Sequence, residues 1–389
     1  MEENNQHLVA DLGGYHNMKQ LRRSAPFRRH EALLLKLFNE PRIHFAELAT
    51  PRLASFLRVV AWNIECGKRF QGIVHVLNTH PLLRFADLLL LNEVDDGMAR
   101  SGNRSVASEL GLEVGAHAIY GVEYLEFSAS AAVDGQHHLN TAALHGNAIL
   151  TRHSFARPRL VRLPRCEKNF ESAQKRLGGR LGLVVDLELG PIRLVIATTH
   201  LDVVNAPRCR QRQLRILLDH LRSTSDLPAI VGGDFNTHTF SRGGRLRGFR
   251  NLARLLIDPN AVAKSLLSPR KFEPALRDLE LFEFRLQGFN DRLHTCRVED
   301  SQLLNSSGLP ESVKRLVKRR FGSETASLDF RLDWLAGRRL KPLGDQEIVD
   351  AATGVRSVSA QTITGLEYRG YPVSDHNPIV ADIALTSFQ

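Results

Sequence analysis

The chain has 389 residues, of which 43% are hydrophobic and 24% are charged, so it can bury a sizeable core in one large domain or in two ordinary ones. No stretch approaches the roughly 18 consecutive apolar residues of a membrane-spanning helix, and there is no low-complexity tract. The formal net charge of +10 favours a polyanionic partner such as nucleic acid, a phosphoinositide or an anionic membrane surface.

The four cysteines, Cys66, Cys166, Cys209 and Cys296, are scattered along the chain, and none has the C-x-x-C spacing of a zinc ribbon. This scatter favours free thiols in a reducing compartment, with two disulfides as the alternative. The stretch MEENNQHLVADLGG lacks a basic region followed by an apolar run, so we predict no signal peptide. These observations lead us to expect a cytoplasmic protein.

In chain order, residues 1–56 come first, polar at their start and helical in pattern later. Over 29–41, Leu34, Leu37 and Phe38 recur at the spacing of one helical stripe, which predicts an amphipathic helix. We expect this N-terminal helical extension to dock on a core. The alternative is an arm that binds a partner.

From about residue 57, short β-rich apolar runs alternate with helical stretches. Strands are predicted at 57–64, 86–94, 146–151, 180–189, 192–201, 228–236, 330–337 and 378–385. Helices are predicted at 72–83 and 208–223. This alternation predicts a layered α/β protein with helices outside packed sheets.

A long segment between Asn236 and Leu332 is largely helical in pattern. Residues 238–330 hold 17 Lys+Arg against 11 Asp+Glu, so +6 of the net charge of +10 lies there. We therefore expect a basic helical insertion at about 238–328. Within it, 310–322 has an apolar face flanked by Lys and Arg, which indicates either a solvated amphipathic helix or a phosphate-contacting surface.

Polar residues that can do chemistry stand at the ends of the apolar strands. They are Asn63, Glu93, His200, Asp234, Asn236, Asp333, Asp375 and His376. A carboxylate that ends a buried strand is costly unless it is paired or binds a cation. Because strand ends can deliver side chains from several strands to one cleft, we expect these residues to form one site.

These residue types suit metal-assisted hydrolysis of a phosphoester. Mg²⁺ prefers oxygen ligands, which Glu93 and Asp375 would supply, with Asn63 as a neutral helper. Histidine suits proton transfer or a charged hydrogen bond near neutral pH. A carboxylate commonly fixes the tautomer of such a histidine, and Asp333 is the candidate partner of His376.

Seven short motifs follow one another along the chain: WNIE, LNEV, HGNAILTR, TTHLD, GGDFNT, RLDWLAG and SDHNPIV. In this order they resemble the endonuclease/exonuclease/phosphatase superfamily over residues 57–389, apart from the insertion. The resemblance implies that 57–389 is the catalytic domain, a four-layered α-β-β-α sandwich with two packed mixed sheets and helices outside. It also implies attack of water on the phosphorus of a phosphodiester, with Mg²⁺, or alternatively Mn²⁺, as the cofactor.

For the metal and the phosphate, the resemblance implies roles at four positions. Glu93 would be the principal metal ligand, and Asp375 would lie near the metal. Asn63 would help to position the metal or the phosphate. Asn147, in HGNAILTR, would be a phosphate-binding or a structural amide.

For the chemistry, the resemblance implies that Asp234 orients or deprotonates the attacking water, while Asn236 holds the phosphate or the nucleophile. His376 would contact the scissile phosphate or act as the base, with Asp333 behind it. His200 would be a general acid. Its place in TTHL resembles the deoxyribonuclease and sphingomyelinase branch rather than the AP endonucleases.

The leading functional prediction is a nuclease, because of the basic charge and His200. The alternatives are a sphingomyelinase-like lipid phosphodiesterase and a phosphatase of small phosphorylated metabolites. A non-catalytic binding module is the competing class, and the presence of every expected catalytic residue type argues against it. The sequence leaves the oligomeric state open.

Overall fold

The computed structural model describes residues 5–128, 130–131, 137–166, 169–172, 174–203, 206–238, 264–299 and 327–385, and the statements below concern these residues. The predicted basic helix at 310–322 and most of the predicted insertion at 238–328 lie outside them. Within the described part of the chain, no helix has the length and apolar character needed to cross a membrane.

The larger β-sheet has eight strands in the order β1-β4-β7-β3-β2-β19-β16, with β9 paired to β4. Strands β2 and β3 run parallel, and the other pairs are antiparallel. The strands are β1 (Arg42–His44), β2 (Phe56–Cys66), β3 (Leu88–Asp96), β4 (His117–Glu126), β7 (Leu144–Thr151), β9 (Arg176–Gly178), β16 (Gln361–Thr362) and β19 (Ile379–Ala384).

The second sheet has five strands in the order β15-β12-β11-β10-β8. Strands β11 and β12 are parallel, and the remaining pairs are antiparallel. The strands are β8 (Ser154–Arg162), β10 (Leu181–Leu189), β11 (Ile192–Thr199), β12 (Ala229–Asp234) and β15 (Asp333–Arg338).

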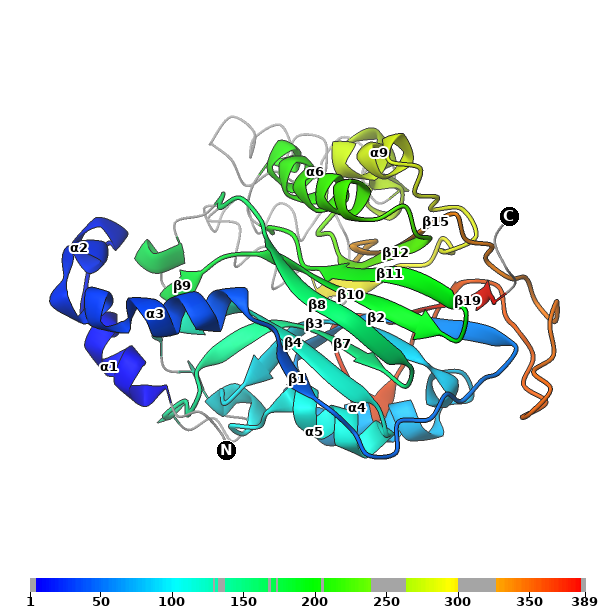
Figure 1. Ribbon diagram of the computed structural model, residues 1–389, viewed down its shortest axis with the longest axis horizontal. Helices are drawn as coiled ribbons and strands as arrows, with labels where there is room; N and C mark the ends of the chain where they lie inside the picture. Colours follow the sequence, from blue (N-terminus) through cyan, green and yellow to red (C-terminus); the bar gives the residue numbers. More distant parts are fainter. Residues whose placement is uncertain are drawn as a thin grey trace.

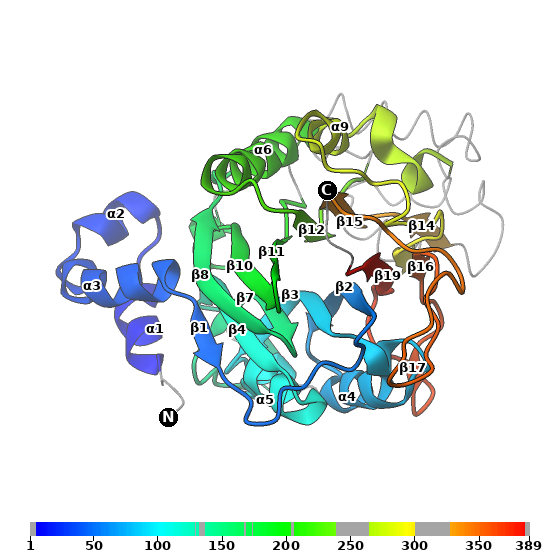
Figure 2. The same ribbon diagram turned by 45° about the vertical axis from the view of Figure 1, so that its right-hand side comes forward.

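Helices cover the outer face of each sheet (Figure 1, Figure 2). On the larger sheet these are α4 (Phe70–Thr79) and α5 (Val106–Val114), and on the second sheet α6 (Pro207–Thr224) and α9 (Pro274–Leu281). The result is a four-layered α-β-β-α sandwich with two mixed sheets, and this confirms the fold predicted from the sequence.

An apolar cluster fills much of the space between the two sheets and explains why the strands appear in the sequence as near-continuous hydrophobic runs. From β2 and β3, Val59 and Leu88 point into this layer and meet residues such as Leu183 and Ile196 of the second sheet. The opposite faces of the same strands pack under the helices, in two further clusters. Strands buried on both faces need apolar residues at successive positions, so alternation disappears from the sequence.

The N-terminal residues form three helices, α1 (Gln6–Gly13), α2 (Met18–Arg23) and α3 (Ala25–Asn39). The side chain of Asn17 caps α2 by accepting a hydrogen bond from the Gln20 amide at 2.9 Å. Leu34 and Leu37 of α3 are buried in the same cluster as α4, α5 and the outer face of the larger sheet. The amphipathic helix predicted at 29–41 therefore lies within α3, docked on the core.

The remaining described elements are short. They are the strand pairs β5 (Ser130–Ala131) with β6 (His137–His138), β13 (Cys296–Glu299) with β14 (Ser327–Phe330), and β17 (Glu367–Tyr368) with β18 (Tyr371–Pro372), and the 3-10 turns η1 (Leu83–Phe85), η2 (Ala99–Ser101), η3 (Asn169–Glu171) and η4 (Pro269–Lys271).

Each strand predicted after residue 57, and each of the helices predicted at 72–83 and 208–223, has a counterpart among the described residues, but three details differ. The predicted strand at 330–337 divides into β14 and β15, because the chain leaves one pairing at Phe330 and enters another at Asp333. Strands β4 and β8 were not predicted. The described part of the insertion is not only helical, since β13 pairs with β14 across a long sequence separation that no local pattern reports.

Candidate active site

The residues singled out at the strand ends meet at one edge of the sandwich. Parallel pairing places the carboxyl ends of β2 and β3 together, and those of β11 and β12 together. The antiparallel strands β15 and β19 begin at the same edge. The residues delivered there are Asn63, Glu93, His200, Asp234, Asn236, Asp333, Asp375 and His376.

His376 is held by a buried carboxylate. Its Nδ1 lies 2.7 Å from Oδ2 of Asp333, and both side chains are almost fully buried. Trp62 donates from Nε1 to the His376 carbonyl at 2.9 Å, and Thr295 Oγ1 accepts the Asp333 amide at 3.0 Å. Burial alone would lower the pKa of His376, but the Asp333 carboxylate outweighs it and raises that pKa well above its ordinary value.

Asp234 lies between the two site histidines and accepts hydrogen bonds from two neighbours. Asn63 Nδ2 donates to its Oδ2 at 3.1 Å, and the Asn236 amide donates to its Oδ1 at 2.9 Å. His200 Nε2 and His376 Nε2 lie 3.5 Å and 3.9 Å from the same Oδ2. Burial, and then the nearby Asp333 charge, raises the pKa of Asp234 to about 7.

A glycine before Asp234 is required by the packing at this strand end. Gly233 has φ of 128°, in the region that favours glycine. An added Cβ would meet the Thr199 carbonyl and would lie 2.6 Å from Asn92 Oδ1. That close approach lets Asn92 Oδ1 accept the Asp234 amide at 2.7 Å, so the GGD stretch links the two sheets beneath the site.

His200 is the site residue with the fewest partners. It is 2% exposed, and neither ring nitrogen has a hydrogen-bond partner among the described residues. Burial, followed by the charge of Arg180, lowers the pKa of His200 well below its ordinary value. A neutral imidazole with a free N–H is therefore presented to whatever enters the site.

Asn147 belongs to a buried network that the sequence reading did not foresee in full. Its Oδ1 accepts from Asn92 Nδ2 at 2.8 Å, and its Nδ2 donates to Glu123 Oε1 at 3.0 Å. Glu123 in turn pairs with Arg180 at 2.8 Å. Asn92 stands directly before Glu93 in LNEV, so its position beside a motif residue was a usable signal, whereas Glu123 lies in the unpredicted strand β4.

Glu93 and Asp375 provide the oxygen atoms best suited to a metal ion. Glu93 is half-buried, and its backbone has φ of 51° at an irregularity in the pairing of β3 with β7. His145 and His376 outweigh burial and lower the pKa of Glu93, which keeps it ionised. Asp375 is exposed, yet partial desolvation and the Glu93 charge raise its pKa.

This pair fits a hard divalent cation. Glu93 and Asp375 lie close enough to repel each other, and within the described residues neither forms an ion pair with Lys or Arg. Asn63 stands between this pair and Asp234. Adjacent carboxylates with no cationic partner are the donor set that Mg²⁺ or Mn²⁺ takes.

Two other groups in the described part of the chain have ligand atoms within 4.8 Å of one another near this edge: Asp234 with Asp333 and His376, and Cys66 with Asp95 and His145. In the first group, Asp333 and His376 are bonded to each other. In the second group, Asp95 already pairs with His145 at 2.8 Å and with Arg100 at 2.7 Å. The Glu93 side therefore keeps the oxygen donors that a divalent metal could use.

One cysteine prediction is wrong. Cys166 and Cys209 form a disulfide across 43 positions, while Cys66 and Cys296 are free and buried. The expectation of four free thiols fails, and so does the alternative of two disulfides. The pairing depends on how the segment after β8 meets the start of α6, which sequence spacing does not reveal.

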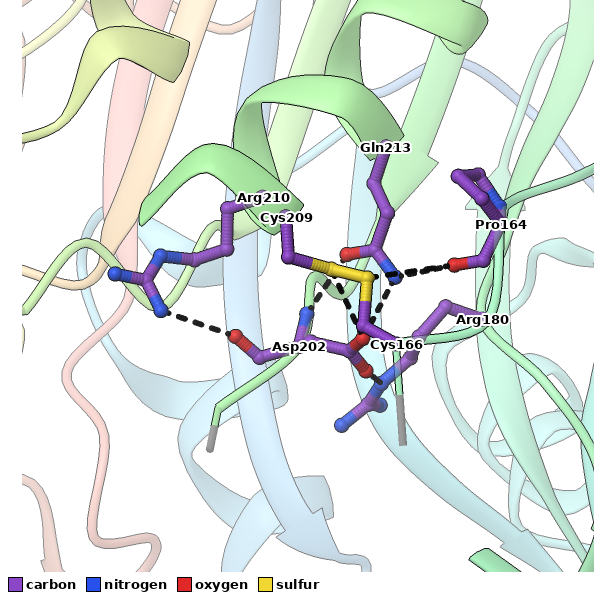
Figure 3. The surroundings of a disulfide bond; sticks show 7 residues. All are labelled: Pro164, Cys166, Arg180, Asp202, Cys209, Arg210 and Gln213. Carbon is purple, nitrogen blue, oxygen red and sulfur yellow. Dashed lines mark hydrogen bonds and ion pairs between the residues drawn. A yellow bond between two sulfur atoms is a disulfide. The ribbon is translucent and has the colours of Figure 1, made fainter. Parts of the chain in front are cut away.

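Asp202, Arg180 and Gln213 surround the disulfide (Figure 3). Asp202 lies beneath it, two residues after His200, and accepts from Gln213 Nε2 at 2.9 Å. Arg180 Nε is 3.6 Å from the other oxygen of Asp202. Because Arg180 also pairs with Glu123, the disulfide, the loop after β11 and the Asn147 network form one connected layer.

These groups share one chemistry: they can bind a hard cation, orient water and supply protons beside a phosphate. That chemistry on this fold defines a hydrolase that acts on phosphoester bonds. The chain belongs to the Endonuclease/Exonuclease/phosphatase family, whose family model matches residues 60–376. Members of this family use divalent metals, and phosphodiesters are suitable substrates for them.

Solved structures with similar folds have low sequence identity to this chain. An endonuclease/exonuclease/phosphatase from Beutenbergia cavernae is 17% identical, with 86% of this chain and 72% of that chain covered and a TM-score of 0.47. The human Nocturnin catalytic domain with bound sulfate is 16% identical, with 90% and 97% covered and a TM-score of 0.42. A humanised TDP2 from D. rerio is 14% identical, with 84% and 98% covered and a TM-score of 0.40. No curated protein sequence matches the chain.

Proposed function

We propose that this protein is a divalent-metal-dependent nuclease that cleaves phosphodiester bonds by attack of water on phosphorus. The observation that carries the proposal is the position of Asp234, with the ring nitrogens of His200 and His376 at 3.5 Å and 3.9 Å. Beside it, Glu93 and Asp375 lack cationic partners within the described residues. This arrangement combines proton-transferring groups with a cation site, as phosphoester hydrolysis requires.

Glu93 and Asp375 would hold the metal, with Asn63 at its side. The bound cation would polarise the phosphoryl oxygens and offset their negative charge. The chain's own contribution here is geometric, because the backbone irregularity at Glu93 fixes where its carboxylate points. Asn147 is then a structural amide that steadies the neighbouring Asn92 rather than a group that contacts phosphate.

Asp234 is assigned the role of orienting and deprotonating the attacking water. Burial raises the pKa of Asp234 to about 7, which suits a group that accepts a proton near neutral pH. Asn236 has φ of 49° and donates from Nδ2 to the Leu201 carbonyl at 3.0 Å. Its amide oxygen is thereby turned toward the site, where it would hold the water or the phosphate.

The two histidines are assigned different roles because their environments differ. The Asp333 partner raises the pKa of His376, so His376 would be charged and would contact the scissile phosphate through Nε2–H. Burial lowers the pKa of His200, so His200 would be neutral and would donate a hydrogen bond from Nε2 to the leaving oxygen. In this proposal His200 is a neutral hydrogen-bond donor, in place of the general acid that the resemblance implied.

Nucleic acid is the proposed substrate because the chain carries a net charge of +10 and the site retains His200, as in the deoxyribonuclease and sphingomyelinase branch. A sphingomyelinase-like lipid phosphodiesterase is the second candidate, favoured by the same histidine. The cytoplasmic location stays a prediction, and a persistent Cys166–Cys209 disulfide in purified protein would argue against it.

A substrate panel with and without chelator tests this proposal. We expect Mg²⁺- or Mn²⁺-dependent cleavage of DNA or RNA and of a chromogenic diester, and weak or no turnover of sphingomyelin and inositol phosphates. Glu93→Gln should lower turnover by about 10²-fold or more, because it removes the ligand charge. Glu113→Gln, at an exposed position, is the matched control. Equal turnover in wild type and Glu93→Gln would contradict the assignment.

A further inference from the structure

A cavity of about 170 Å³ lies where the N-terminal helices meet the segment between β8 and β9. Met18 of α2 lines it on one side. On the other side it is lined by Arg165, Asn169, Phe170 and Arg176. Glu171 also lines the cavity, and its side chain is exposed. A cavity with an apolar floor and a few polar groups is the usual form of a ligand site.

Two arginines, Arg165 and Arg176, line this cavity together with one carboxylate, that of the exposed Glu171. Arg176 Nε is buried and has no hydrogen-bond partner within the described residues. Neither Arg165 nor Arg22 forms an ion pair with a described carboxylate. Burial, and then the charge of Arg22, lowers the pKa of Arg165. Arg165 is exposed and Arg176 is half-buried, so both guanidinium groups can reach an anion from solvent, and a bound anion would offset the repulsion between their charges.

The cavity connects to the active site through stacked side chains. The Arg176 guanidinium lies 4.1 Å from the centre of the Tyr124 ring, and the Arg180 guanidinium lies 5.6 Å from the same ring. Arg180 pairs with Glu123, which accepts from Asn147. Arg176 is also near enough to His200 to help lower the pKa of that histidine. Positive charge therefore extends from the catalytic edge to the cavity.

The walls of the cavity are fixed by contacts outside it. Lys175 Nζ donates to the carbonyls of Gly13 and Tyr15, which ties the N-terminal helices to β9. The Cys166–Cys209 disulfide joins the residue after Arg165 to α6. A site assembled before the ligand arrives loses less entropy on binding.

We propose that this cavity binds a backbone phosphate of a single-stranded nucleic acid whose scissile phosphate lies in the active site. Arg165 and Arg176 would grip that distant phosphate with paired N–H donors, which the planar guanidinium is built to provide. The cavity would thus select a polynucleotide over a single phosphodiester. This inference rests on the proposed nuclease function and adds a second contact point for the substrate.

Steady-state kinetics on two substrates tests the inference. The variants are Arg165→Gln and Arg176→Gln, and Arg193→Gln is the control at an exposed position of β11. With a 12-nucleotide single strand, each variant should raise KM by about tenfold, and Arg165→Gln should leave kcat unchanged because only binding is lost. With bis(p-nitrophenyl) phosphate, which cannot reach the cavity, Arg165→Gln and the control should match wild type, while Arg176→Gln measures how far the loss of its charge near His200 changes kcat.

Binding measurements separate failure of this inference from failure of the nuclease assignment. Fluorescence anisotropy with the same oligonucleotide in EDTA needs no turnover. Wild type should bind, and each variant should weaken binding and flatten its salt dependence by roughly 0.7 per lost phosphate contact. Wild-type binding without cleavage of either substrate would overturn the nuclease function but keep the cavity's role.

Three results would overturn the inference itself: unchanged KM and affinity for the oligonucleotide, equal losses on both substrates, or weakened binding to sphingomyelin vesicles with oligonucleotide affinity intact. Thermal unfolding of each variant checks the fold. Where Arg176→Gln is unstable, Arg176→Lys replaces it. Arg176→Lys keeps the positive charge but lacks the planar guanidinium with its paired N–H donors. It should therefore give an intermediate KM on the oligonucleotide, and a wild-type KM would count against the proposed bidentate contact.

Discussion

The two ends of the strand pair β2–β19 are built from the same kinds of residue but treat buried charge in opposite ways. At one end Arg58 and Asp382 face each other in register and form a bidentate pair at 2.8 Å and 2.7 Å, with no exposed side-chain surface. At the other end His200 and one oxygen of Asp333 are buried without hydrogen-bond partners in the described structure. At the first end the Arg58–Asp382 pair is satisfied internally, whereas at the second end buried polar atoms of His200 and Asp333 remain without hydrogen-bond partners among the described residues.

At the active end, strained backbone accompanies the unpaired groups. Glu93 and Asn236, at the active end, have φ of 51° and 49°, which is unfavourable for residues with side chains. At the Arg58 end, Asp382 also accepts the Val358 amide at 2.8 Å, so its remaining capacity is used locally. The difference teaches that unpaired buried groups together with backbone strain, rather than buried charge alone, identify a functional site.

The largest effect should come from Asp234→Asn at the active end. Removing the proton acceptor should lower turnover by about 10³-fold, while the melting temperature stays equal or rises because a buried charge is gone. Asp219→Asn, in an exposed ion pair, is the control. The measurements are turnover on a chromogenic diester and the melting temperature of the variant, the control and the wild type. Near-wild-type turnover would show that Asp234 is only structural.

Arg58→Met should have the opposite effect to Asp234→Asn: the protein should lose stability, while its turnover should stay the same. It leaves Asp382 buried without its partner, so we expect a loss of about 3–5 kcal/mol in the free energy of unfolding. Turnover per folded molecule should not change, because the pair lies at the opposite end of β2. Denaturant titration measures the first quantity and kinetics the second.

The double variant Arg58→Met/Asp382→Leu is the matched test of this ion pair. It removes both charges, so it should recover most of the lost stability. If the folded Arg58→Met protein lost turnover, the Arg58 end and the active end would be coupled. The two ends could then not be treated as independent.

The smallest effect concerns Asp87, which has an unpaired buried oxygen at the Arg58 end and so tests whether an unpaired atom alone implies function. Its Oδ1 accepts the Arg52 amide at 2.7 Å, whereas Oδ2 has no partner within the described residues. Burial raises the pKa of Asp87 from 3.8 to about 6. Between these values the folded state holds the proton and the unfolded state does not, so this contribution to stability falls as pH rises.

Asp87→Asn removes that titration. The variant should gain stability relative to wild type between pH 4 and pH 8, by up to about 3 kcal/mol, with turnover unchanged. Denaturant titrations of both proteins at the two pH values measure the difference. A difference that does not vary with pH would show that Asp87 is not the titrating group. A loss of turnover in Asp87→Asn would show that Asp87 has a functional role.

Much of the fold could be predicted from the sequence, because the strands that form the interior of the sandwich are continuous apolar runs. The strand containing Ile230 and that containing Leu90 were predicted within a few residues for this reason. The edge strand β8 was missed because its residues are mostly half-exposed and carry several arginines. The family prediction from the ordered motifs is confirmed by the match over residues 60–376.

The candidate active site could be predicted from the sequence only in part. Strand-end position was enough to nominate Asp234, His376 and Glu93 for one cleft, because buried carboxylates need a reason to exist. It was not enough for Glu123 or Arg180, whose pairing joins strands that are far apart in sequence. Arg180 is buried and paired with Glu123, a position that no local sequence pattern indicates.

The sequence by itself determined the layered α/β architecture, the family and the residue types at the catalytic edge, since these depend on local hydrophobic runs and short motifs. Tertiary structure decided the rest. It set the opposite pKa shifts of His200 and His376, because His376 meets Asp333, whereas burial and then the charge of Arg180 dominate at His200. It also joined Cys166 to Cys209 and placed α2 over Arg165 and Arg176, contacts between distant segments that no local pattern encodes.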